Sequence, residues 1–439
     1  MRLLTRRMVR VDLSLAFVAA WALISLGAAS HFGTYTPGAI GMVAAGMIIL
    51  TVAVLRLGTS RCRPPGRVSL VLAGVVAAAS AQIYPAGQHA RGPAEAWAHG
   101  LLLAAGLGII LLVCQREGSR LLVVGIVVLA GAAGVAGIIA SPRPPIDDWY
   151  ILQGSAHALL HLRNIYAHPW PGARGHTLPY LPGTAVFLAP FFLVFGDVRY
   201  GLLGALIAAA VAVAALRKPR GGHAAAVAAC LVLTYPRVLH GIEQSWPEPL
   251  LLALIAAMVW AVETERPVVA VICFTAALAT KQHVLIMVPL AAGWPAFGWK
   301  RTVTAVGAAG AIVAAWFVAS PRAFVHGAIT YNLSLPARLD SLSLFTTSIR
   351  AGHTPSFALV PLLMAVALVV GLWRLPRTTP GFVLGSAWLL GMFNLLNKQS
   401  FFNEWSLVVG LIVLGVATLS LAGDDRDPSP ARLMTSEEA

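Results

Sequence analysis

Charged residues are scarce in this chain of 439 residues, and acidic residues are the scarcest of them. Asp and Glu together number 17, against 31 Lys and Arg, and charged residues make up 11% of the sequence. A soluble domain carries about 25% charged residues. With a mean hydropathy of +0.79, the composition excludes an ordinary soluble domain.

Cysteine is also rare. The four cysteines are isolated from one another, without the spacing of a disulfide framework or a zinc site. The formal charge of +14 does not indicate nucleic-acid binding, because the basic residues lie in short loops between apolar runs. That distribution is what the positive-inside rule predicts for a membrane protein.

Apolar runs of membrane-spanning length recur from end to end of the chain. They predict an all-α polytopic membrane protein with a bundle of about 12–14 transmembrane helices. The run at 181–196 is short and contains Pro182, Gly183 and Pro190, so we expect a re-entrant or juxtamembrane element there. Full spans are expected near 13–30, 38–55, 68–84, 98–114, 121–140, 200–216, 223–239, 248–262, 266–280, 282–298, 302–320, 356–373, 380–396 and 406–422.

Loop charges orient these spans in a cell membrane. Basic residues before residue 11 and in the loops 56–67, 115–120 and 217–223 place both termini in the cytoplasm, with an uncleaved first helix. All histidines except His223 then fall on or near the exoplasmic side, as do the acidic residues Asp147, Asp148, Glu243, Glu248, Asp340 and Glu404. The predicted parts of the chain are N-terminal helices (1–120), a module with a long exoplasmic loop at 141–196 (121–220), the remaining bundle (221–422) and a disordered cytoplasmic tail (423–439).

Two adjacent carboxylates, Asp147 and Asp148, follow the fifth span in the stretch "PPIDDWYILQG". From residue 149 to 162 the apolar residues recur at helical spacing, which predicts a short helix lying at the membrane interface. The acidic pair is also compatible with a simple cap for that helix. A carboxylate beside a second one near a low-dielectric interface gains a raised pKa, which suits a general base.

The stretch resembles a known enzyme superfamily. An acidic pair after a transmembrane helix, then "NIY" (164–166), then "YLPG" and "APFF" (180–192) is similar to the first exoplasmic loop of the superfamily C (GT-C) integral-membrane glycosyltransferases. Within it, the similarity is greatest to the bacterial branch of polyprenyl-phosphate-dependent mannosyl- and arabinofuranosyltransferases. The similarity is sharp over about 141–220 and looser beyond, where "ATKQH" (279–283) and "NKQS" (397–400) still fit.

The resemblance implies an inverting transfer of mannose or arabinofuranose from a polyprenyl-phosphate carrier to a glycolipid or polysaccharide acceptor during cell-envelope synthesis. It implies that Asp147 is the general base and that Asp148 orients the acceptor. A lipid phosphate leaving group needs cationic or polar partners, and the expected donor-phosphate residues are Lys281, Lys398, Arg143, Gln282 and Gln399. The expected acceptor-binding residues are Glu243, His157 and Tyr180.

No nucleotide-binding motif is present, so a lipid-linked sugar is expected as donor and no organic cofactor is expected. We expect no protein metal site, although a divalent metal would be compatible with the superfamily, and we expect a monomer surrounded by membrane lipids. His157 and His161 are spaced to share a metal but lack a third ligand. Tryptophans of the outer loops, such as Trp246, are expected at the membrane interface.

Two other classes of protein remain open on the sequence. A transporter or lipid flippase would carry charges at the middle of its spans and an inverted repeat, and neither pattern is found. A non-catalytic membrane scaffold would not need the intact acidic pair. Lys281 could also simply extend to the membrane interface rather than contact a lipid phosphate.

Overall fold

The computed structural model describes residues 13–59, 65–83, 87–115, 119–167, 169–216, 222–419 and 421. Within these ranges all regular structure is helical and no strand occurs, which confirms the all-α prediction. The N-terminal basic residues, most of the basic loop at 217–223 and the tail at 423–439 lie outside the described residues.

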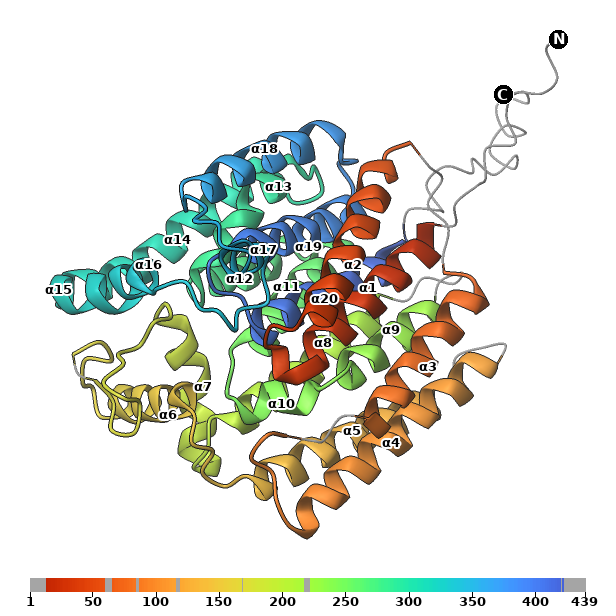
Figure 1. Cartoon of the computed structure of the whole chain (residues 1–439), viewed down its shortest axis with the longest axis horizontal. Helices are drawn as coiled ribbons and strands as arrows, with labels where there is room; N and C mark the ends of the chain where they lie inside the picture. Colours follow the sequence, from red (N-terminus) through yellow and green to blue (C-terminus); the bar gives the residue numbers. More distant parts are fainter. Residues whose placement is uncertain are drawn as a thin grey trace, which may run out of the picture.

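Of the first five long helices, α3, α4 and α5 lie side by side along one edge of the molecule, and α1 and α2 lie nearer its centre (Figure 1). α1 packs against α2, α3 packs against α4, and α4 packs against α5. Pro37 and Pro93 stand in the first turns of α2 and α4, where a proline leaves no helical hydrogen bond unmade. The elements are α1 (Leu13–Ala29), η1 (Ser30–Gly33), α2 (Pro37–Arg56), α3 (Arg67–Ile83), α4 (Pro93–Cys114) and α5 (Arg120–Ala140).

The next helices carry the acidic pair and the short apolar run. α6 (Asp147–Leu160) is the helix predicted for the interface, and α7 (Gly183–Phe195) covers the run expected to be re-entrant. α7 has 13 residues, contains Pro190 and makes an angle of 115° with α8 (Arg199–Ala215). α6 and α7 pack together at one edge of the molecule, beside α14–α16 (Figure 1).

The remaining helices complete the bundle. α8 packs against α9 and α11, and α20 packs against α1, α9, α11 and α19, so the first and last helices meet in the core. The elements are α9 (Gly222–Thr234), α10 (Val238–Glu243), α11 (Glu248–Glu263), α12 (Pro267–Leu278), η2 (Gln282–Met287), α13 (Val288–Gly293), α14 (Gly298–Ala319), α15 (Pro321–Phe324), η3 (Val325–Thr330), α16 (Tyr331–Ser334), α17 (Leu344–Arg350), α18 (Leu359–Arg374), α19 (Thr379–Leu396) and α20 (Phe402–Thr418).

Several of these helices are long and apolar enough to cross a membrane. Six meet that description by length and composition, or seven when the bent pair α7–α8 is counted as one span. They are α1 with η1, α2, α4, α5, α14 and α19. Shorter apolar helices such as α12 and α20 have 12 and 17 residues, about 18 and 26 Å, which is less than the ~30 Å hydrocarbon core. The structure is that of a helical membrane protein, and a count of 12–14 crossings requires these shorter helices to cross as well.

One expected span is broken. Residues 282–298 were expected to form a single helix, but η2 is a tight 3₁₀ segment, α13 has only six residues, and a turn follows before α14. Pro289 stands in the first turn of α13 and Pro295 lies in the turn beyond it. Each proline lacks a backbone N–H and clashes with the preceding turn, so the run cannot continue as one helix.

Loops expected on the same side of the membrane meet at the same end of the bundle. At one end the Phe32 ring lies 5.1 Å from the His240 ring, and the Tyr35 N–H donates to the carbonyl of Asp340 at 2.8 Å. At the other end an Arg67 N–H donates to the Cys114 carbonyl. The segments predicted to be exoplasmic lie together at the end of the bundle that holds Phe32 and His240.

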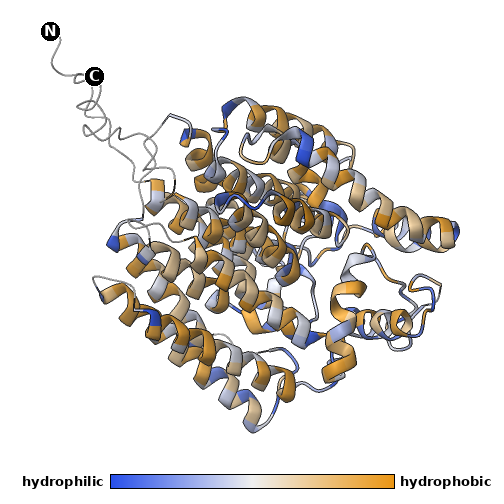
Figure 2. Ribbon diagram, turned by 180° about the vertical axis from the view of Figure 1, so that it is seen from behind, coloured by the Kyte–Doolittle hydropathy of each residue, from blue (hydrophilic) through white to orange (hydrophobic). Residues whose placement is uncertain are grey.

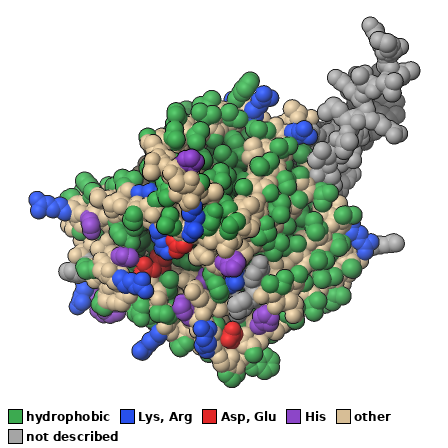
Figure 3. Space-filling model, viewed as in Figure 1, with side chains coloured by type: hydrophobic (Ala, Val, Ile, Leu, Met, Phe, Trp, Pro, Cys, Tyr) green, Lys and Arg blue, Asp and Glu red, His purple; other side chains and the backbone are tan. Residues whose placement is uncertain are grey.

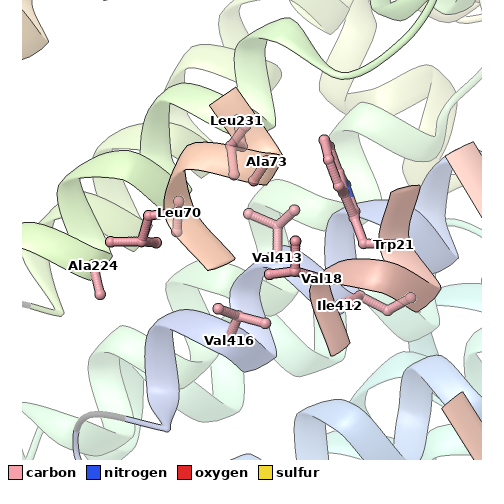
Figure 4. A pocket seen from close by; sticks show the side chains of 10 residues that line it. Val18, Trp21, Leu70, Ala73, Ala224, Leu231, Ile412, Val413 and Val416 are labelled. Carbon is pink, nitrogen blue, oxygen red and sulfur yellow. The ribbon is translucent and has the colours of Figure 1, made fainter. Parts of the chain in front are cut away.

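The body between the two ends is apolar. Figure 2 shows hydrophobic ribbon over most helix surfaces and polar residues near their ends. A small cavity of about 20 Å³ lies between α1, α3, α9 and α20, lined only by apolar residues and Trp21 (Figure 4). It is too small and too apolar to be a substrate site, so the candidate site must be sought among the loops.

Candidate active site

The acidic pair forms the first turn of α6. Pro144 and Pro145 lie in the short bent connection between α5 and α6, and Asp147 and Asp148 are the first two residues of the helix. The Oδ1 of Asp147 accepts the backbone N–H of Asp148 at 3.0 Å, and carboxylates are favoured at a helix N-terminus. The pair therefore does stabilise the helix start, but each carboxylate also has a second partner.

Asp148 is held by residues from two distant segments. Its Oδ1 accepts the hydroxyl of Tyr180 at 2.7 Å, and its Oδ2 accepts the indole N–H of Trp246 at 3.0 Å. Burial and the adjacent Asp147 carboxylate raise the pKa of Asp148 to about 7, against the lowering effects of Tyr180 and Lys281. A carboxyl with this pKa exchanges a proton near neutral pH, which is the property required of a general base.

Asp147 pairs with a histidine. The Nδ1 of His176 lies 3.0 Å from Oδ2 of Asp147, and both side chains are 34% exposed. The His176 ring lies 5.3 Å from the Tyr331 ring, which belongs to the outer segment after α14. This carboxylate thus faces the solvent-accessible side of the pair, whereas Asp148 faces the protein.

The loop 161–176 returns to α6 because small residues allow close packing. A Cβ at Gly154 would lie 2.4 Å from the ring of Trp170, and a Cβ at Gly172 would lie 2.5 Å from the ring of Tyr150. Gly172 also has a φ of +84°, a conformation that glycine adopts at little cost. These contacts fold the loop against the helix and bring His176 beside Asp147.

The "YLPG" stretch is tied to the end of α12. The Leu181 N–H donates to Thr280 O at 3.1 Å, and the Gly183 N–H donates to Ala279 O at 2.8 Å. A Cβ at Gly183 would lie 2.6 Å from that Ala279 oxygen, so only glycine allows this approach. Lys281 directly follows Thr280, and these backbone bonds place its ammonium 5.2 Å from the centre of the Tyr180 ring.

Lys281 is the buried cation of the site. Its ammonium forms an ion pair with Glu248, and the two side chains are 10% and 1% exposed. Burial alone would lower the pKa of Lys281, but Glu248 and Glu404 outweigh it and raise that pKa. The lysine does not lie free at the interface, and it partly neutralises three neighbouring carboxylates, Glu248, Glu404 and Asp148.

Gln282, expected at the donor phosphate, has a different set of contacts. Its side-chain amide donates to the carbonyls of Pro179 and Ala328 at 2.9 and 2.6 Å. Asn332 also donates to Pro179 O at 2.9 Å. Gln282 is therefore a positioning residue that fixes the backbone just before Tyr180.

Lys398 and Gln399 lie against the outer segment 331–340. The Lys398 ammonium donates to Leu333 O at 2.7 Å, and the Gln399 amide donates to Pro336 O at 2.6 Å. Arg338, in the same segment, pairs with Asp340 and contributes to the charge around Tyr331. Figure 3 shows acidic side chains in a hollow of this face, bordered by Lys, Arg and His. The site thus has carboxylates in its interior and cations at its rim.

Three expected site residues have no hydrogen bond or ion pair with the acidic pair in the described part of the chain. Glu243 accepts the backbone N–H groups of Gln88 and His89 at 2.6 and 2.8 Å. Although burial opposes ionisation, hydrogen bonds from His240 and these amides lower the pKa of Glu243 to about 2. His157 is exposed. It lies ten residues after Asp147 on α6, which corresponds to about 15 Å along the helix axis.

Arg143 is the third of these residues, and it lines a pocket with His89 and Arg91. No group of three or more His, Cys, Asp or Glu side chains in the described ranges is arranged to hold a metal ion. The structure accordingly groups Tyr180 and Lys281 with the acidic pair, and it leaves Glu243, His157 and Arg143 outside.

Sequence reasoning missed His176, Glu248 and the role of Trp246 as partners of the site. His176 follows a turn-rich stretch with no periodicity, and Trp246 was expected at the membrane interface. One feature of the sequence could have indicated Glu248 as a site residue. It is one of few acidic residues, and it is the first residue of a helix, as Asp147 is.

No family model, curated protein or solved structure matches this chain. The function must therefore be inferred from the geometry of the site itself. Its central elements are the two unlike carboxylates, the buried Lys281–Glu248 pair and the cationic rim.

Proposed function

We propose that the protein is a membrane glycosyltransferase that transfers a sugar from a polyprenyl-phosphate donor to an acceptor hydroxyl at the end of the bundle that holds the acidic pair. Mannose and arabinofuranose are the proposed sugars, and the acceptor is a lipid or glycan of the cell envelope. The observation that carries the proposal is Asp148, a carboxyl with a pKa of about 7 held by Tyr180 and Trp246.

The reaction needs one proton acceptor and one stabilised leaving group. A carboxylate of the acidic pair takes the proton of the acceptor hydroxyl as its oxygen bonds to the sugar C1, while the bond from C1 to the phosphate oxygen breaks. Attack opposite the leaving group inverts the configuration at C1. The electron pair leaves on the polyprenyl phosphate, and the proton remains on the carboxyl until it is released to solvent.

The roles within the pair differ from those that the resemblance implies. Asp148 has the pKa suited to the base, and Asp147 with His176 forms the more exposed dyad that can orient the acceptor. The rim cations Lys398 and Arg338 are the partners proposed for the leaving phosphate. Lys281 acts through Glu248 and the acidic pair rather than as a free phosphate ligand.

A transporter or flippase is the alternative function. Such a protein would need its buried charges near the middle of spans. Glu248 is instead the first residue of α11, and Lys281 lies between α12 and η2, so this charged pair sits at helix ends.

The test is sugar transfer by the purified full-length chain in detergent. The protein is incubated with polyprenyl-phosphate mannose or polyprenyl-phosphate arabinofuranose and a lipid extract as acceptor, and release of polyprenyl phosphate is measured. The double variant Asp147→Asn/Asp148→Asn is the blank. Release from either donor above the blank supports the proposal, and no release from either donor contradicts it.

A further inference from the structure

A second polar pocket lies outside the acidic site, beside the outer ends of α4 and α5. It has a volume of about 340 Å³ and is lined by His89, Arg91, Ser141, Pro142, Arg143 and Pro145, which we call the basic pocket. This volume is within the range of small-ligand sites. Two arginines and one histidine line it, and none of the described residues that line it is acidic.

The walls of the basic pocket are held rigidly from behind. The loop that carries His89 and Arg91 is fixed by Glu243, which accepts the N–H of His89 at 2.8 Å. The same loop is joined to the end of α5, because the Arg91 N–H donates to Ala140 O at 3.0 Å. Glu243, expected to bind acceptor, therefore shapes this pocket instead.

The opposite wall is fixed by a buried ion pair. Arg199 is fully buried, pairs with Asp197, and donates from Nη1 to the carbonyl of Ser141 at 2.7 Å. The backbone before the acidic pair is thus anchored at Ser141. Preorganised walls of this kind lower the cost of binding a ligand.

The polar groups that line the basic pocket are incompletely paired. The Ser141 hydroxyl is buried, at 2% residue exposure, without a hydrogen-bond partner among the described residues. Arg143 is exposed and likewise has no partner within the described ranges. Arg91 uses Nη1 for the carbonyls of Gln88 and Ala90. An acceptor in the pocket would give the two guanidinium groups the partners that the described residues do not fully supply.

We propose that the basic pocket binds a phosphate group, with Arg91 and Arg143 as charged donors. Guanidinium groups match the geometry of phosphate oxygens, and charge-assisted hydrogen bonds are the stronger kind. The exposed Trp97, on the first turns of α4, is a residue type that lies at membrane headgroup level. The phosphate belongs either to an anionic lipid headgroup or to a free phosphate compound, and the inference does not depend on the proposed function.

The test uses the full-length protein in detergent with three probes: phosphatidylglycerol, phosphatidylcholine and inorganic phosphate. Bound lipid is counted by native mass spectrometry, and phosphate binding is measured by the shift in Tm. The variant is Arg91→Gln/Arg143→Gln, and the matched control is Arg163→Gln/Arg322→Gln, which removes two exposed arginines elsewhere in the outer segments. If the double variant does not fold, Arg143→Gln alone carries the test, because Arg143 makes no bond within the described part of the chain.

We expect the pocket variant to bind the phosphate probe at least about tenfold more weakly, and the control to bind like the wild type. Loss confined to phosphatidylglycerol identifies a lipid headgroup, and loss seen with inorganic phosphate identifies a free phosphate compound. Equal binding by wild type and pocket variant, or equal loss in the control, overturns the proposal.

Discussion

The indole N–H of Trp246 lies 3.0 Å from Oδ2 of Asp148, although 98 residues separate them in the chain. Trp246 follows α10 at the outer end of the bundle, and Asp148 lies in the first turn of α6. Together with Tyr180, this indole gives each oxygen of the carboxylate one donor. The hydrogen bonds fix the direction of a carboxyl whose pKa is about 7.

Replacing the indole donor should shift the pH range of activity. Trp246→Phe keeps an aromatic ring but removes the N–H that favours ionised Asp148, so the pKa of Asp148 should rise further. We expect the acidic limb of the kcat/KM profile to move up by about 1 pH unit. The control is Trp97→Phe, at an exposed position on α4. An unchanged profile in Trp246→Phe would show that the indole does not act on the base.

The stability of the protein should also depend on the ionisation of Asp148. The pKa of Asp148 is about 7 in the folded state and 3.8 ordinarily, so the folded chain holds this proton more tightly than the unfolded chain. The stability that it contributes is fully present below pH 3.8, and it is lost as pH rises toward 7. The Asp148→Asn variant has no carboxyl at this position, so its stability does not contain this pH-dependent contribution.

The wild type should therefore lose free energy of unfolding relative to Asp148→Asn between about pH 5 and pH 8. The comparison uses the change with pH, so a constant offset from the substitution does not affect it. Chemical unfolding of both proteins in detergent, at about pH 5 and about pH 8, measures how the free energy of unfolding of each changes with pH. Parallel pH dependence in the two proteins would be incompatible with a raised pKa at Asp148.

The buried ion pair can be tested by removing one partner and then both. Lys281→Met leaves the carboxylate of Glu248, 1% exposed, without its cation, and we expect a loss of about 3–5 kcal/mol in free energy of unfolding. Lys281→Met/Glu248→Gln removes the unpaired charge and should recover most of that loss. A double variant as unstable as the single one would mean that packing, rather than charge, dominates at Lys281.

The close approach at Gly183 gives a steric prediction. Gly183→Ala places a methyl group 2.6 Å from Ala279 O, so the "YLPG" stretch must move away from α12. We expect a loss of about 1–3 kcal/mol and lower activity, because Tyr180 lies in that stretch and Lys281 follows the Ala279–Thr280 backbone to which the stretch is bonded. Gly307→Ala is the matched control, since a Cβ there meets no atom within 4 Å. Equal stability of the two variants would contradict the role assigned to Gly183.

Patterns local in sequence predicted much of the fold. Helical periodicity and the paired prolines anticipated α6, and the short run with Pro190 anticipated the bent element α7. The break at 282–298 was not anticipated, because apolarity alone hides the effect of Pro289 and Pro295.

The candidate site was partly predictable, because polar residues are conspicuous in an apolar sequence. The acidic pair, Tyr180 and Lys281 stood out as polar residues of outer segments, and they do come together. Glu243 is likewise a polar residue of an outer segment, but it accepts hydrogen bonds from the backbone of Gln88 and His89 and so fixes that loop. Which polar side chains meet is decided by contacts between residues 29 to 155 positions apart in the chain, and periodicity does not contain that information.

The measurement that tests Asp148 as the base most directly is the rate of sugar transfer by Asp148→Asn, from whichever polyprenyl-phosphate donor the wild type uses. The matched control is Glu95→Gln, which removes a carboxylate from the first turn of α4 at the same end of the bundle. We predict that kcat falls by a factor of about 10²–10⁴ in Asp148→Asn, while Glu95→Gln retains the wild-type rate and both variants keep the wild-type helical content. A wild-type kcat in Asp148→Asn would contradict the assignment of Asp148 as the general base.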